Sequence, residues 1–97
     1  MGATASQITH GTLDANVVIS ANSIRVESIF IGNTSGAAVA VTLQKANGDA
    51  LYVVPVADDG AEDWNPNALF EDGLTAVSAG DAAVTITVTH SSSLGGA

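Results

Sequence analysis

Hydrophobic and polar residues alternate along two segments of the chain, 39–44 and 84–89. In both, Val, Leu or Ile occupies every second position, and Ala, Thr or Gln lies between. Because successive side chains of a β-strand point to opposite faces of a sheet, this alternation predicts two strands with one buried and one solvent-facing side. β-Branched residues are also frequent in four other segments of strand length. The pattern therefore predicts strands over residues 17–21, 24–31, 39–45, 51–56, 69–77 and 83–90.

Short runs of Asn, Asp, Ser and Gly separate the predicted strands, and no segment has a helical period of useful length. The Asn47-Gly48 dipeptide predicts a tight hairpin with a type I′ turn, which makes the strands on either side antiparallel neighbours. Six or seven short antiparallel strands with short connections indicate an all-β fold. We expect a single small antiparallel β-sandwich of jelly-roll-like form, and a small closed barrel is the alternative.

The two ends of the chain differ in composition from the middle. Residues 1–14 are rich in Thr, Ser, Ala and Gly, with only Ile8 and Leu13 as apolar anchors, so we expect an N-terminal arm that is ordered by a neighbouring molecule. Ile8 is therefore a candidate contact residue. Residues 91–97 have the composition of a linker and are expected to form a flexible C-terminal tail. The sandwich domain is then residues 15–90.

The predicted strand 24–31 is apolar on both faces. Ile24, Val26 and Phe30 share one face, and Ile29 and Ile31 make the second half of the opposite face apolar. Either a β-bulge near Ser28 returns these side chains to the core, or Ile29 and Ile31 face outward and contact another subunit. The small size of the core favours the contact.

The predicted strand 51–56 has the same property. Leu51, Val53 and Pro55 oppose Tyr52, Val54 and Val56, and all six are apolar or aromatic. A loop could cover a central strand of this kind, or Tyr52 and Val54 could contact a second subunit. Pro55 has no N–H to donate, so this part of the strand is expected at a sheet edge or at a bulge. Together, the apolar outer faces and the small core predict a homo-oligomer, and we expect a trimer.

Charge and composition exclude several classes of partner. The 97 residues carry ten acidic side chains against Arg25 and Lys45, a net charge of −8, which excludes direct binding to nucleic acid or to anionic membrane. The absence of cysteine excludes disulfides and thiolate sites. No apolar run approaches the length of a membrane span, and the first residues lack the features of a secretion signal.

Residue types that carry chemistry are present without the spacing that chemistry needs. His10 and His90 do not form a paired metal motif, and no serine lies in a Gly-x-Ser-x-Gly sequence, so we expect neither an enzyme nor a cofactor. A hydrolase using either histidine with the carboxylates is the last-ranked alternative. The run 58–63 contains four carboxylates, but its spacing does not match an EF-hand. It is expected to be a solvated acidic loop, with calcium binding as the alternative.

Trp64 is the only tryptophan and lies in the loop-like run 61–67, where Pro66 prevents a helix. Two interpretations follow. The indole could fold back as a lid over an open end of the sandwich, burying apolar area. It could instead anchor this subunit to a neighbour, since tryptophan is enriched among residues that dominate binding energy.

The order of strands and turns resembles that of small virion proteins of tailed bacteriophages. In the C-terminal half, the similar features are an Asp-Gly-Leu turn, a Gly-Asp turn and a final Thr/Val strand, found here at Phe70-Glu71-Asp72-Gly73-Leu74, Gly80-Asp81 and 84–89. In the N-terminal half, they are a strand, a turn and an Ala-rich strand, found here at 23–32, Asn33-Thr34-Ser35-Gly36 and 37–43. The resemblance covers residues 16–90.

This resemblance implies a β-sandwich structural component of a virion and carries over no catalytic residue. A capsid decoration or cement protein, bound to the major capsid protein on the capsid surface after synthesis in the host cytoplasm, is the first expectation. A compact acidic domain with long termini suits a clip that is repeated over a shell. The alternative is a tail, neck or fibre domain that binds a partner or a host glycan, with Trp64 and the acidic loop as its contacts.

Overall fold

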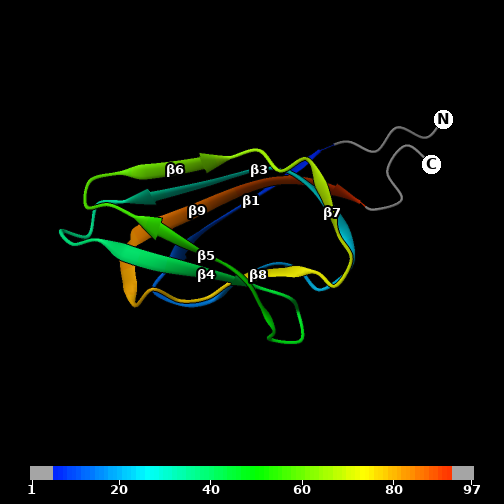
Figure 1. Cartoon of the computed structure of the whole chain (residues 1–97), viewed down its shortest axis with the longest axis horizontal. Helices are drawn as coiled ribbons and strands as arrows, with labels where there is room; N and C mark the ends of the chain where they lie inside the picture. Colours follow the sequence, from blue (N-terminus) through cyan, green and yellow to red (C-terminus); the bar gives the residue numbers. More distant parts are fainter. Residues whose placement is uncertain (1–5, 93–97) are drawn as a thin grey trace.

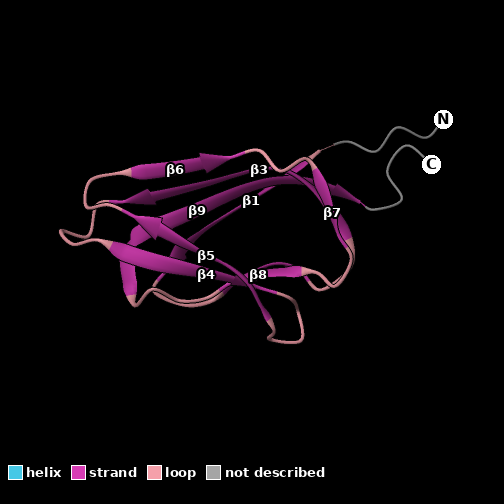
Figure 2. Ribbon diagram, in the orientation of Figure 1, coloured by secondary structure: helices cyan, strands magenta, loops and turns pink. Residues whose placement is uncertain are grey.

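The computed structural model describes residues 6–92, and within this range the chain forms nine β-strands. Figure 2 shows these strands joined by short loops. Residues 93–97 lie outside the described range, and Ser91 and Ser92, which were predicted to begin the C-terminal tail, belong to the last strand. The strands are β1 (Gln7–Leu13), β2 (Val17–Ser20), β3 (Ile24–Asn33), β4 (Val39–Gln44), β5 (Ala50–Val56), β6 (Ala61–Trp64), β7 (Ala68–Phe70), β8 (Leu74–Ala76) and β9 (Asp81–Ser92).

The strands form two antiparallel sheets packed face to face (Figure 1). The first sheet has the order β1-β9-β3-β6, with β7 also pairing with β3, and the second has the order β2-β8-β4-β5. The predicted all-β sandwich is confirmed, and this strand order is that of a jelly roll. The strand number exceeds six or seven because β1 and β6 were not predicted and residues 69–77 form two strands. The core between the sheets consists of Leu13, Ile19, Ile24, Val26, Ile29, Ile31, Val41, Leu43, Val56, Phe70, Leu74, Ala76, Val84, Ile86 and Val88.

Strand β1 corrects the prediction of an N-terminal arm. Gln7 to Thr12 pair in continuous register with β9, and Leu13 is fully buried in the core. The sequence here is polar because β1 lies at the edge of its sheet, where backbone pairing with β9 holds the strand and few apolar side chains are needed. The arm interpretation is therefore wrong for Gln7–Leu13, while residues 1–5 lie outside the described range.

A β-bulge in β3 decides which of its side chains are buried. Val26 pairs with His90 and Ser28 with Thr89, so Glu27 is an extra residue on β3. Before the bulge the even-numbered residues Ile24 and Val26 point into the core, and after it the odd-numbered residues do. Ile29 and Ile31 are each 1% exposed, whereas Phe30 is 45% exposed. The bulge interpretation is confirmed. The alternative, that Ile29 and Ile31 are outward contact residues, is wrong.

The hairpin between β4 and β5 is confirmed, but its turn type is not the predicted one. Gly48 has a φ of 99°, and Asn47 has no positive φ, which a type I′ turn requires. Instead, the Gly48 N–H donates to the Lys45 carbonyl at 2.9 Å and the Lys45 N–H donates to the Asp49 carbonyl at 2.8 Å. β5 is the outermost strand of its sheet, which confirms the edge position expected for Pro55 and contradicts a central strand covered by a loop.

A tight turn divides the predicted strand 69–77 into β7 and β8, which belong to different sheets. Gly73 has a φ of 81°, and a Cβ at this position would lie 2.6 Å from the Ser20 carbonyl oxygen. Only glycine fits both the left-handed conformation and the close backbone approach. The turn thus carries the chain from one layer to the other.

Asn33, at the end of β3, is fully buried and joins two loops. Its Nδ2 donates to the carbonyls of Ala37, Val56 and Ala57 at 2.7, 3.2 and 3.2 Å. Its Oδ1 accepts hydrogen bonds from the backbone N–H and the hydroxyl of Ser35 at 3.0 and 2.7 Å. The side chain therefore links the turn after β3 to the end of β5.

Candidate functional site

Three aromatic side chains line one open side of the sandwich. Trp64 is the last residue of β6 in the first sheet, and Tyr52 belongs to β5 in the second. Their ring centroids are 4.8 Å apart in an edge-to-face arrangement, and Tyr52 lies 6.4 Å from Phe70 of β7. Because β5 and β6 are the outermost strands of their sheets on this side, the aromatic rings cover the opening between the two layers.

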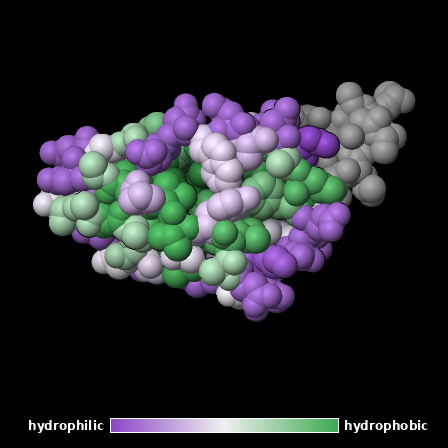
Figure 3. Space-filling model, in the orientation of Figure 1, coloured by the Kyte–Doolittle hydropathy of each residue, from purple (hydrophilic) through white to green (hydrophobic). Residues whose placement is uncertain are grey.

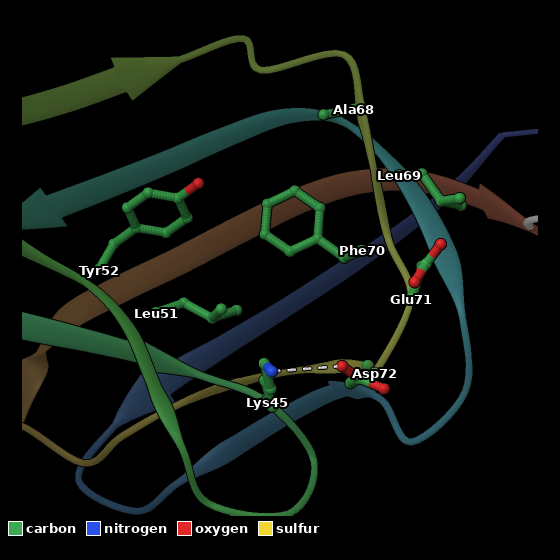
Figure 4. Close-up of a pocket in the computed structure, with 9 residues that line it drawn as sticks. Lys45, Leu51, Tyr52, Ala68, Leu69, Phe70, Glu71 and Asp72 are labelled. Carbon is green, nitrogen blue, oxygen red and sulfur yellow. Dashed lines mark ion pairs between the residues drawn. The ribbon is translucent and has the colours of Figure 1, made fainter.

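A groove of about 330 Å³ continues from this aromatic row between β5 and β7. Figure 4 shows Tyr52, Leu51 and Phe70 around the space, with Lys45 and Asp72 at one end. Tyr52 and Leu51 come from β5, and Phe70 comes from β7. The groove therefore has a mainly apolar wall made by both sheets and is open to solvent.

Charged residues border the groove at the ends of the neighbouring loops. Lys45 Nζ lies 3.4 Å from Asp72 Oδ2, and the Asp72 side chain is 61% exposed, so this ion pair contributes little to stability. Glu71 is exposed beside it, and Asp49 is exposed in the adjoining hairpin. Lys45 and Asp72 offset each other, so the Glu71 carboxylate leaves the border of the groove with a net negative charge.

The same side of the molecule exposes further apolar surface. Tyr52 and Leu69 are large side chains that remain exposed here, whereas Val53, next to Tyr52 on β5, is exposed on the opposite face of that strand. Figure 3 shows hydrophobic surface between β5 and β7, with hydrophilic surface along β6 and over the β4–β5 hairpin. A second pair of exposed apolar residues, Ile8 and Val18, lies on β1 and β2 at the opposite edge of the sandwich.

The structure places the predicted contact residues in different environments. Ile29 and Ile31 belong to the core. Val54 is half-buried and packs against the core, whereas Tyr52 and Ile8 are exposed. For Tyr52 and Ile8, contact with a partner stays a prediction.

Trp64 is half-buried and packs against the core, as the lid interpretation expects. It lies at the end of β6 and not in a loop, and it covers a side of the sandwich and not an end. The β6 position was missed because Ala61, Glu62 and Asp63 are exposed on an edge strand and give no apolar alternation. The anchor interpretation stays a prediction.

The two histidines lie on opposite faces of the first sheet. His10 is exposed, with its Nδ1 2.7 Å from the Thr87 hydroxyl. His90 is buried, with its Nε2 2.8 Å from the Thr9 hydroxyl. Burial lowers the pKa of His90 below its ordinary value, and the Glu27 carboxylate acts in the opposite direction by raising the pKa. The structure therefore does not bring the two imidazoles together.

The acidic run 58–63 is half turn and half strand. Asp58 and Asp59 form a turn in which Asp59 has a φ of 55°. Glu62 and Asp63 are consecutive residues of β6, so their side chains point to opposite faces. Within residues 6–92, no cluster of three or more His, Asp or Glu side chains could hold a metal ion.

Most residues of the groove were not predicted as site residues. Leu51 and Tyr52 belonged to a strand with two apolar faces, which was a usable signal. Lys45 and Asp72 are 27 positions apart in the chain, and only the packing of the two sheets brings them together.

No family model, no curated protein and no solved structure matches this chain. The described part of the chain contains no helix that could span a membrane.

Proposed function

We propose that this protein is a non-enzymatic structural component of a phage virion, a capsid decoration or cement protein that binds across subunits of the major capsid protein. The observation that carries the proposal is the exposure of large apolar side chains on both edges of one sandwich. Ile8 and Val18 are 69% and 61% exposed on β1 and β2, and Val53 is 61% exposed on β5. Two separate apolar edges suit a subunit that contacts two neighbours at once.

The resemblance of residues 16–90 to small virion proteins supports the same proposal. A shell also repeats each binding site many times, which suits a protein of this small size. A small domain with modest contacts is retained strongly when symmetry multiplies those contacts. The aromatic row at Tyr52 and Trp64 supplies rigid apolar side chains of the kind that dominate binding energy at interfaces.

Copy number in purified virions of the phage that encodes this chain tests the proposal. A shell protein is expected in roughly hundreds of copies per particle, whereas a tail or neck protein is expected in about six or twelve copies. These copy numbers follow from the closed symmetry of each assembly. Quantitative mass spectrometry measures them. Few copies would favour the tail alternative, and absence from the virion would contradict both.

Removal and re-addition of the protein test the stabilising role. Shells stripped of this protein should melt at a lower temperature and release DNA more readily, and re-addition should restore both properties. Val53→Lys should restore them poorly, because an ammonium group replaces an exposed apolar side chain on β5. Ala38→Lys, at an exposed position in the β3–β4 turn, is the charge-matched control. Equal stability of stripped and complete shells would contradict the role.

A further inference from the structure

We propose that the groove between β5 and β7 binds an extended segment of a partner protein in which one large apolar side chain is flanked by lysine or arginine. The inference deepens the proposed function, because it names the chemistry of the segment that binds. Only the identification of the partner as the shell protein rests on the proposed function. Three independent features of the groove support it: its size and lining, its charge, and the edge strand that forms one wall.

The size and lining of the groove fit one large apolar side chain. Its volume of about 330 Å³ lies at the lower end of the range for ligand pockets, roughly 300 to 1,000 Å³. Leu51, Tyr52 and Phe70 surround the space, as Figure 4 shows. An aromatic or branched aliphatic side chain would be removed from water here by contact with both sheets.

The charge around the groove favours a basic partner. Glu71 and Asp72 lie at its border, against Lys45 alone, which leaves a net negative charge there. Arg25, the other basic side chain, donates to the Asn67 carbonyl. The whole chain has a net charge of −8, so an acidic segment would be repelled from the groove, while lysine or arginine would be attracted.

The wall formed by β5 favours an extended polypeptide over a small molecule. β5 is the outermost strand of its sheet, so one row of its backbone groups faces away from β4. Pro55 has no N–H, which limits strand addition to the part of β5 that precedes it. Leu51 and Tyr52 belong to that part. A peptide that adds to this edge would place one side chain in the groove.

Peptide titration with the full chain tests the proposal, and Trp64 is the reporter. Trp64 is the only tryptophan, and its ring centroid is 4.8 Å from that of Tyr52, which lines the groove. The probe is acetyl-Gly-Lys-Arg-Phe-Arg-Lys-Gly-amide, which contains no tryptophan. We expect a saturable change in Trp64 fluorescence as the peptide is added. The affinity for the peptide should fall as the salt concentration rises. A peptide with Gly in place of Phe, and one with Glu in place of each Lys and Arg, should each bind about tenfold more weakly or not at all.

Two variants with matched controls locate the binding site. Leu51→Ala shortens a half-buried side chain of the groove, and Val17→Ala shortens a half-buried side chain on β2, far from it. Asp72→Asn removes a carboxylate from the border, and Asp14→Asn removes an exposed carboxylate from the β1–β2 turn. The groove variants should weaken peptide binding several-fold, and the controls should leave it unchanged. Thermal melting by circular dichroism confirms that each variant is folded.

Each outcome supports or overturns the proposal. Equal binding of the acidic peptide, or equal effects of the groove variants and their controls, would overturn it. So would self-association of the chain that Leu51→Ala abolishes, because the occupant would then be a second copy. If the peptide fails to bind but the chain is abundant in virions, the inference fails and the proposed function stands. If the peptide binds but the chain is absent from virions, the function fails and the groove assignment stands.

Discussion

The rings of Tyr52 and Trp64 pack edge to face across the opening between the two sheets, with ring centroids 4.8 Å apart and planes at 79°. Tyr52 is anchored by the pairing of β5 with β4, and Trp64 by its pairing with Ile29 of β3. Each ring therefore depends on a different sheet. The contact joins the two layers on the side where the groove lies.

A double-mutant cycle measures this contact. Trp64→Ala should lower the free energy of unfolding by about 2 kcal/mol, less than a fully buried aromatic truncation, because the indole is half-buried. The coupling between Tyr52→Ala and Trp64→Ala should be about 1 kcal/mol, as for other aromatic pairs. Urea denaturation of the four proteins gives these values. Strictly additive effects would show that the rings do not stabilise each other.

Asn33→Ala should destabilise the fold by about 3 kcal/mol, because buried carbonyls lose their donor and the Ser35 N–H loses its acceptor. Asn47→Ala is the matched control, since the Asn47 Oδ1 accepts the Asp49 N–H in the same two-residue spacing but at an exposed turn. The control should cost about 1 kcal/mol or less. Equal effects in chemical denaturation would contradict the structural role assigned to Asn33.

Gly73→Ala should destabilise the protein more than Gly36→Ala. Both glycines have a positive φ, 81° and 92°, so alanine is strained at either position. Only at Gly73 would the new Cβ meet backbone, whereas at Gly36 nothing lies within 4 Å. We expect costs of about 3 kcal/mol or more and about 1 kcal/mol, respectively. Similar melting temperatures would show that the approach to Ser20 relaxes easily.

The buried His90 predicts a loss of stability in mild acid. Its pKa is lowered in the folded state mainly by burial, so the unfolded chain binds more protons over the pH range between the folded pKa and the ordinary value of 6.5. Its stabilising contribution is present above pH 6.5 and is lost as the pH falls through the folded pKa.

The measurement is the melting temperature of wild type and His90→Gln between about pH 8 and about pH 5. The wild-type melting temperature should fall more steeply with decreasing pH than that of the variant. His10→Gln is the control, because this imidazole is exposed. Parallel curves for wild type and His90→Gln would refute the assignment.

The exposed apolar edge strands predict self-association into a trimer. Light scattering at high protein concentration should give three times the monomer mass, and Ile8→Lys should shift the distribution toward monomer, because Ile8 is exposed on β1. Ala38→Lys, in an exposed turn, should not. A monomer at every concentration would contradict this prediction.

The alternation of apolar and polar residues, together with the turn residues between the strands, determined the all-β fold and the β4 and β9 strands, and Asn47-Gly48 determined the β4–β5 hairpin. Val41 and Leu43, and likewise Val84, Ile86 and Val88, are buried as their spacing predicts. The spacing predicts burial correctly here because the period of two is a local property of an extended chain. For a strand with one solvent-facing side, the buried positions can therefore be assigned without knowing which strands pair with it.

Only the tertiary structure decided which face is buried where the pattern allows two answers. One extra residue at Glu27 turns Ile29 and Ile31 into the core and Phe30 outward, and the pairing of β3 with β9 sets that register. Strand β1 is ordered by hydrogen bonds to β9, which a polar sequence does not reveal. The groove likewise exists only because sheet packing brings Lys45 and Leu51 beside Phe70 and Asp72. Register and packing depend on residues distant in the chain, so local periodicity could not determine them.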